Sequence, residues 1–292
     1  EKKFDPYQFI GFILIALILT WMLYRNGPSE EQELLEKGFT EQVVTPSSPG
    51  NNETSAAILQ RQKVEVFGDL GELFTSKSFE NVSISTENLS YEIQSKGGQI
   101  VVLQLDDFDN YEEKPLRLIS EANTDFNITL TTKDGRVLNT RDIFFTPTLF
   151  DYTDAYKLVM TASIIPGQRI VFEYEFPKQG YLYTVSLKSE GMQTILNSAT
   201  PPSLVWKTDA FRNSRSIDYE NRYTEFTFGY EEDRVDYLSL NGEDKETKKG
   251  IRWISYRQHF FSSILIPDTP IATAELTSIN LASEEALEEK FT

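Results

Sequence analysis

The clearest structural signal in the chain is RIVFEYEFPKQGYLYTVSL, which occupies residues 169–187. Its first half alternates, and one face of an extended segment carries Ile170, Phe172, Tyr174 and Phe176. Its second half alternates in the same way, at Tyr181, Tyr183, Val185 and Leu187. The four residues between the halves, PKQG, have the composition of a turn. Because a period of two is typical of a half-buried strand, this segment predicts an antiparallel hairpin.

The same alternation recurs through residues 61–282. Polar residues separate the apolar ones at Leu89, Tyr91 and Ile93, and a Gly97-Gly98 turn precedes another apolar run. Further alternating runs lie at 127–132 and 224–230. Many short strands with one apolar face each predict two antiparallel sheets packed face to face. We therefore expect residues 61–282 to form a mainly β, large, antiparallel and twisted β-sandwich.

Signals for helices are few in the sandwich region, and the clearest one lies at its end. Ser283 is a good N-cap, and Glu284 and Glu285 follow it in what would be the first helical turn. Acidic residues are stabilising there because the helix dipole is positive at its N-terminus. We therefore expect residues 283–292 to be the start of a short terminal helix.

Residues 1–25 predict one transmembrane helix that anchors the chain. The uncharged run YQFIGFILIALILTWMLY at 7–24 would span about 27 Å as a helix, close to the thickness of the hydrocarbon core. The bulky residues at its end disfavour a cleaved signal peptide, and the absence of a polar stripe disfavours a buried globular helix. Lys2 and Lys3 precede the run, whereas Arg25 alone follows it. The N-terminus is therefore expected in the cytoplasm and the remainder across the membrane.

Residues 26–60 predict a flexible polar tether. The part at 45–52 reads TPSSPGNN, which is rich in turn-forming residues and lacks apolar periodicity. The formal net charge of the whole chain is −17, from 45 acidic and 28 basic residues. Such a surface repels phosphate backbones, so nucleic acid is not an expected partner, and solubility is the simple role of the charge.

The sequence offers no catalytic, cofactor-binding or metal-binding residue that stands out, and we expect a protein that is not an enzyme. The absence of cysteine excludes thiol nucleophiles and Cys-ligated metals. Asp106, Asp107 and Asp109 lack the glycine and the terminal glutamate of a calcium loop, so a solvated loop is the simpler interpretation. The acidic run at 231–233 is interpreted as a turn. The single histidine, His259, lies among aromatic residues and is interpreted as a packing residue.

Two short segments, at residues 253–267 and 86–98, resemble the YidC family of membrane protein insertases of Gram-negative bacteria. Residues 253–267, WISYRQHFFSSILIP, are similar to a segment near the end of the large periplasmic domain of that family. Residues 86–98, TENLSYEIQSKGG, are similar to its first strand and Gly-Gly turn. The order of anchor, tether, β domain and terminal helix also agrees, and the first residues look most like Bacteroidetes members.

The resemblance implies a sandwich similar to the mutarotase-like supersandwich. It also implies partners: the lipid bilayer, nascent inner-membrane proteins, the Sec translocon and its SecDF accessory, which the family contacts through this periplasmic domain. The family inserts proteins through a C-terminal membrane core with a positively charged groove, and no residue here matches that groove. We therefore expect the N-terminal part of a longer protein of the bacterial inner membrane, with its β domain in the periplasm.

Three functions are compatible with these observations. The first is an anchored accessory domain of an insertase, with apolar clefts and sheet edges that hold extended polypeptide. The second is a periplasmic carbohydrate-binding or mutarotase-like sandwich, whose chemistry would need a histidine acid beside a carboxylate base. The third is a structural spacer without a partner. The resemblance favours the first function, and the residues that contact partners stay unassigned.

Overall fold

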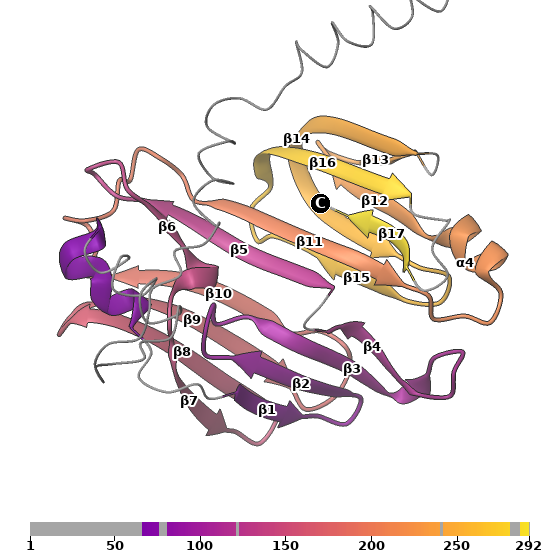
Figure 1. Ribbon diagram of the computed structural model, residues 1–292, viewed down its shortest axis with the longest axis horizontal. Helices are drawn as coiled ribbons and strands as arrows, with labels where there is room; N and C mark the ends of the chain where they lie inside the picture. Colours follow the sequence, from indigo (N-terminus) through magenta and orange to yellow (C-terminus); the bar gives the residue numbers. More distant parts are fainter. Residues whose placement is uncertain (1–65, 76–80, 121–122, 240–241, 281–286, 292) are drawn as a thin grey trace, which may run out of the picture. The chain divides into compact units, whose positions relative to one another are not determined.

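The computed structural model of the chain describes residues 66–75, 81–120, 123–239, 242–280 and 287–291 (Figure 1). The predicted anchor at 1–25 and the tether at 26–60 lie outside the described residues. In the ranges described, no helix is long and apolar enough to cross a membrane. The ladders between the described strands are all antiparallel, so the prediction of a mainly β, antiparallel fold is confirmed.

The described strands form three sheets, whereas the sequence predicted two. The first sheet has the order β1-β2-β3-β4 and consists of β1 (Asn81–Ser85), β2 (Leu89–Gln94), β3 (Ile100–Asp109) and β4 (Pro115–Ile119). The second has the order β10-β9-β8-β7 and consists of β7 (Thr146–Asp151), β8 (Ala155–Ile165), β9 (Gln168–Pro177) and β10 (Thr184–Glu190).

The third sheet has nine strands in the order β13-β12-β14-β16-β17-β11-β5-β6, with β15 paired to β14. Its strands are β5 (Thr124–Thr131), β6 (Val137–Asn139), β11 (Ser203–Phe211), β12 (Glu225–Tyr230), β13 (Arg234–Tyr237), β14 (Glu243–Arg257), β15 (Ser262–Leu265), β16 (Ile271–Asn280) and β17 (Leu287–Phe291). Three short helices complete the described part: η1 (Gly68–Phe74), η2 (Thr140–Asp142) and α4 (Ile217–Tyr223).

The predicted hairpin is confirmed as β9 and β10, with Phe172 opposite Leu187. The alternating apolar residues of β9 are buried, as are those of β2 on the sheet that faces it (Figure 1). Tyr91 of β2 packs against Phe176 of β9, with ring centroids 4.5 Å apart. These contacts make the first hydrophobic core, in which two four-stranded sheets pack face to face.

A second, smaller core lies within the nine-stranded sheet, around Phe226, Phe228, Ile251 and Tyr256. The ladder between β5 and β11 connects the part of the chain that forms the first core to the part that forms the second. The buried Asn123 adds two hydrogen bonds at this junction, because its amide donates to the carbonyl oxygens of Leu118 (3.1 Å) and Asp209 (3.2 Å).

The helix predicted over residues 283–292 is wrong for the part that the structure describes. Leu287–Phe291 form strand β17, which pairs with β16 on one side and with β11 on the other. The helix propensity of Leu, Glu and Lys favours a helix locally. A strand at this position satisfies backbone groups of two neighbouring strand edges at once, and this tertiary pairing outweighs the local preference.

Candidate functional site

An open cavity of about 980 Å³ lies where the first sheet meets β11, β15 and the loops before β10 and α4. Its volume is at the upper end of the range for ligand sites in proteins. Apolar side chains from four strands form its floor, namely Leu89, Leu103, Leu105, Leu118, Ile119 and Trp206. The floor is well supported, because the Trp206 ring packs 4.3 Å from that of Tyr256, whose hydroxyl donates to the Trp206 carbonyl oxygen (2.7 Å).

The mouth of the cavity exposes large apolar side chains to solvent. Phe260 is 68% exposed and Ile264 is 57% exposed. Tyr181 joins them, because β10 begins at Thr184 and not at residue 181, so Tyr181 lies in the preceding loop instead of on the predicted strand. Clustered exposed apolar residues are typical of interaction sites, whereas scattered ones are not.

One side of the cavity is the edge strand β15. Its residues Ser262, Ser263 and Ile264 line the cavity. Within the described part of the chain, β15 pairs with β14 and with no other strand. Its other edge therefore has backbone N–H and C=O groups available to a further strand.

The loops at the cavity rim are held by Glu220, a buried carboxylate of α4. Its Oε2 accepts hydrogen bonds from the backbone N–H of Ser214 (2.6 Å) and from the Ser214 hydroxyl. Its Oε1 accepts from the backbone N–H of His259 (3.4 Å) and from the Gln258 amide (3.5 Å). One carboxylate thus fixes two rim segments, at 213–214 and 258–259, relative to each other.

His259 lies in an aromatic stack at the rim, as its interpretation as a packing residue predicts. Its ring centroid is 3.9 Å from that of Phe260, 5.1 Å from that of Tyr223 and 5.8 Å from that of Tyr219. The contact with Glu220 passes through the His259 backbone and not through its imidazole. This is a positioning arrangement, whereas acid–base chemistry on a sugar would need the imidazole and the carboxylate to face a common substrate.

The three aspartates that the sequence placed in a loop lie instead in the exposed end of β3. Asp106 accepts a hydrogen bond from the Ser90 hydroxyl (2.8 Å), and Asp107 accepts one from the Asn88 amide (3.0 Å). These bonds to β2 and to its preceding turn keep the acidic segment extended. Among the residues that the structure describes, no group of three His, Cys, Asp or Glu side chains is arranged to hold a metal ion.

Sequence reasoning missed the residues of the cavity, even where it had noticed their neighbourhood. Phe260 and Ile264 lie in the 253–267 segment that carried the family resemblance, but nothing in the sequence separates their exposed side chains from the buried ones. Trp206 was not singled out at all. The sequence signal that could have indicated the site is the short segment that forms β15, which follows the aromatic residues at 259–261. Very short strands are typical of sheet edges.

Fold and cavity together define an antiparallel β-sandwich domain with an open apolar binding cavity at its edge. The chain belongs to the YidC periplasmic domain family, whose sequence profile matches residues 81–292. The protein named membrane protein insertase YidC of Parabacteroides distasonis is 25% identical, over 98% of this chain and 48% of the relative. Proteins of the same name from Porphyromonas gingivalis and Phocaeicola vulgatus are 26% and 27% identical, over 91% and 94% of this chain and 44% of each relative.

These comparisons confirm the resemblance found in the sequence, and they support the insertase interpretation over the carbohydrate-binding one. The periplasmic β-sandwich is also the fold that the resemblance implied. The chain spans about half the length of the curated relatives it matches.

Proposed function

We propose that this chain is the anchoring and periplasmic accessory part of a membrane protein insertase, and that its cavity holds an extended apolar segment of a client polypeptide. The observation that carries the proposal is an apolar cavity bordered by a strand edge without a second partner in the described structure. Apolar side chains of a client would enter the cavity, while its backbone would pair with β15. A lipid chain would use the cavity but not the strand edge.

The expected affinity is moderate. Burying three or four apolar side chains stabilises a complex by about 5–10 kcal/mol, and ordering the client offsets several kcal/mol of that gain. The remainder, about 3–6 kcal/mol, corresponds to a dissociation constant no tighter than tens of micromolar. A client that is on its way into the membrane must be released again, so weak and reversible binding suits this role.

The position of the domain in the cell belongs to the same proposal. The apolar run at 7–24 would cross the inner membrane once, with the N-terminus in the cytoplasm and the β-sandwich in the periplasm. The basic residues before the run and the periplasmic domain family support this orientation. Membrane insertion itself would be performed by the part of the relatives that this chain does not span. The Sec translocon and a SecDF-type accessory are the expected neighbours.

Photo-crosslinking tests the client site. We would replace Ile264 by p-benzoylphenylalanine and, as a matched control, Val235 of β13, which is 65% exposed and does not line the cavity. During synthesis of an inner-membrane protein in cells, position 264 is expected to form adducts with the nascent chain and position 235 is not. Equal adducts at both positions, or none at position 264, would refute the proposal.

Protease protection tests the orientation. Protease added to intact spheroplasts should cut the 26–60 segment if that segment lies in the periplasm. Cleavage that requires lysis of the cells would place the segment on the cytoplasmic side, and the proposed arrangement would then be wrong.

A further inference from the structure

We propose that the tip of the β3–β4 hairpin, residues 108–115, is a lid that controls entry to the cavity. This inference rests on the cavity being the client site proposed above. It is carried by three features of the described structure: an interrupted ladder at the base of the tip, a compact turn within it, and two weak contacts that fasten it to the opposite rim.

The interrupted ladder is the hinge. Leu105 pairs with Leu116, and the next pair is Asp109 with Pro115, so residues 106–108 of β3 face no residue of β4. A bulge of this size bends a strand and weakens its pairing. On the other side of β3, the strand register with β2 ends at Leu105, and Asp106 and Asp107 still bond to Ser90 and Asn88. Beyond Asp107, no described hydrogen bond joins β3 to β2, so the tip bends from Phe108 onward.

The tip itself is built to move as one piece. The Asn110 carboxamide oxygen accepts hydrogen bonds from the backbone N–H groups of Glu112 (2.9 Å) and Lys114 (3.1 Å). The Asn110 N–H donates in turn to the Lys114 carbonyl oxygen (2.8 Å). Glu113 adopts a left-handed conformation with φ of 61°, which closes the turn. These local bonds do not depend on the rest of the domain.

The tip covers part of the cavity. Phe108, Asp109, Asn110 and Tyr111 all line it, and the Phe108 ring lies 5.3 Å from that of Phe261 on the β15 side. Figure 1 shows the β3–β4 hairpin and the loop between β11 and α4 at the same end of the domain. A movement at the hinge would therefore change the width of the cavity mouth.

Two contacts fasten the tip to the 212–216 loop on the opposite rim. The Arg212 guanidinium lies over the Tyr111 ring, 4.3 Å from its centroid, and the Arg215 guanidinium is 3.7 Å from the Glu113 carboxylate. The side chains of the ion pair are 83% and 84% exposed, so their attraction is weak and is screened by salt.

The two sides of this fastening differ in rigidity. The Arg212 side chain is fixed within its own loop by a hydrogen bond to the Ser214 carbonyl oxygen (2.9 Å), and Ser214 is held by the buried Glu220. The tip has no comparable buried anchor among its described contacts. The 212–216 loop is therefore the rigid side of these contacts, and the hairpin tip is the side that moves.

A reversible chemical bridge tests the lid. The chain has no cysteine, so Glu113→Cys with Arg215→Cys introduces two thiols at exposed positions. A short bis-methanethiosulfonate reagent joins the thiols, and dithiothreitol separates them again. Methyl methanethiosulfonate on the same double variant is the matched control, since it modifies both thiols without joining them. The probe is a fluorescein-labelled peptide of alternating Leu and Thr, added to the full chain in detergent micelles.

The bridged protein is expected to bind the peptide at least tenfold more slowly than the control, with full recovery in dithiothreitol. Equal association rates in the bridged and the control protein would overturn the lid. If the control protein itself does not bind the peptide, the proposed client site is refuted, and the lid proposal, which rests on that site, is refuted with it.

A second measurement needs no ligand. Arg212→Ala removes the contact with Tyr111, and we expect it to raise hydrogen exchange about threefold at 108–114, because an exposed cation–π contact contributes about that factor. Exchange in β9 of the first core should not change. Unchanged exchange at the tip would show that the hairpin is not held by this contact, and the lid would be refuted.

Discussion

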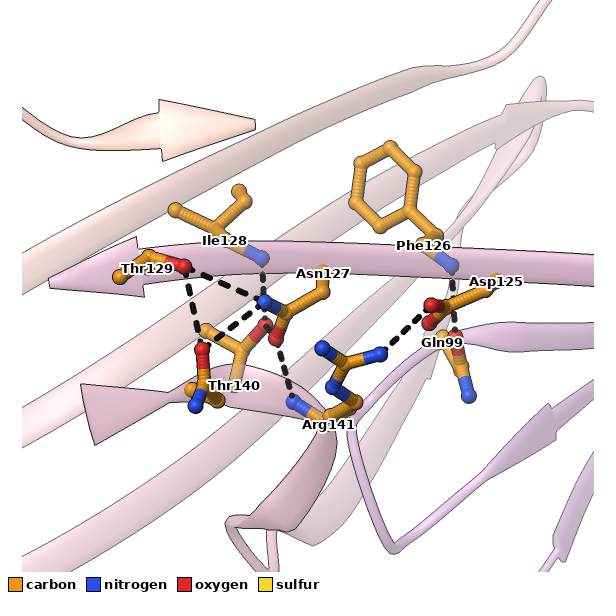
Figure 2. Close-up of polar contacts among 9 residues, drawn as sticks. Gln99, Asp125, Phe126, Asn127, Ile128, Thr129, Thr140 and Arg141 are labelled. Carbon is orange, nitrogen blue, oxygen red and sulfur yellow. Dashed lines mark hydrogen bonds and ion pairs between the residues drawn. The ribbon is translucent and has the colours of Figure 1, made fainter. Parts of the chain in front are cut away.

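Asn127 is a buried polar side chain whose amide is fully hydrogen-bonded (Figure 2). Its nitrogen donates to Thr129 Oγ1 (3.2 Å) and to Asn139 Oδ1 (3.1 Å). Its oxygen accepts from the backbone N–H of Arg141 (3.1 Å) and from the Thr140 hydroxyl (3.4 Å). These bonds tie β5 to β6 and to η2, so the side chain holds these three elements together inside the fold.

We expect Asn127→Ala to destabilise the protein by about 2–3 kcal/mol, because it leaves several buried polar groups without partners. Urea unfolding followed by tryptophan fluorescence measures the change. Asn81→Ala is the matched control: that residue is exposed, its amide bonds to the Glu92 carboxylate, and its loss should cost at most about 0.5 kcal/mol. Similar losses for the two variants would contradict the bracing role of Asn127.

Asp134, in the turn between β5 and β6, makes the stability of the fold depend on pH. Hydrogen bonds from Arg136 and from the Thr132 hydroxyl lower the pKa of its carboxyl from 3.8 to about 2. A carboxyl that is more acidic in the folded state stabilises the fold above its unfolded pKa, and the contribution disappears as the pH falls through about 2. We expect Asp134→Asn to be less stable than the wild type near neutral pH, with the difference vanishing between pH 3.8 and about 2. Thermal unfolding of both proteins over this pH range measures it, and a difference independent of pH would contradict the electrostatic origin.

The Gly97-Gly98 turn between β2 and β3 depends on glycine for two separate reasons. Gly98 has φ of 62°, and a Cβ there would lie 2.9 Å from the Phe172 ring and 3.1 Å from that of Phe145. Gly135 also has a positive φ, of 85°, but a Cβ there would meet nothing within 4 Å. Substitutions at Gly98 and at Gly135 can therefore separate the cost of backbone strain from the cost of steric overlap.

We expect Gly135→Ala to cost about 1 kcal/mol from the positive φ alone. Gly98→Ala should cost about 3 kcal/mol, because overpacking against the rings of the first core adds to the same strain. Chemical denaturation of both variants measures the difference. Equal losses would mean that the core yields to the added methyl group without cost.

Helix α4 positions the loops at the cavity rim through the hydrogen bonds of Glu220. We expect Glu220→Gln to destabilise the protein by about 1–3 kcal/mol, because an amide replaces an acceptor-only carboxylate that faces several donors. Hydrogen exchange should rise at 213–216 and 258–261, while β9 stays protected. Asp218→Asn is the control, since that residue is exposed in the same helix. Unchanged exchange at both rim segments would contradict the positioning role of Glu220.

The elements that the sequence predicted well are those whose signal is local. In β2 and β9, one face is buried, so the burial pattern repeats the alternation of the sequence. Helix α4 escaped notice because seven residues are too short to show a helical period. Strand β17 was mistaken for a helix because its extended conformation depends on pairing with β11 and β16, which lie elsewhere in the chain. No local pattern contains that information.

The candidate site was beyond prediction from the sequence for a related reason. Its floor combines Leu103 of β3, Leu118 of β4 and Trp206 of β11, and its edge is β15. Each of these residues would be interpreted as core on its own. The cavity is lined by the first sheet together with β11 and β15 of the third sheet, so it depends on how strands far apart in the sequence are brought together. The family resemblance indicated the class of protein but could not identify this surface.

The two hydrophobic cores are expected to unfold as one cooperative unit. Phe172 represents the first core and Phe228 the second, and both are fully buried. The β5–β11 ladder and the Asn123 hydrogen bonds join the two regions, and the described residues of both belong to one compact unit. Loss of either core would leave strands of that shared ladder without support on one face.

We therefore expect Phe172→Ala and Phe228→Ala each to cost about 3–5 kcal/mol and to shift the same single thermal transition, by about 10 °C. The double variant should show the sum of the two losses within about 0.5 kcal/mol, because the residues belong to separate clusters and share no described contact. Calorimetry of the purified chain in mild detergent measures both effects. If Phe228→Ala instead splits the transition in two, the second core unfolds independently, and the cavity between the first sheet and β15 would then open through partial unfolding and not through movement of the hairpin tip.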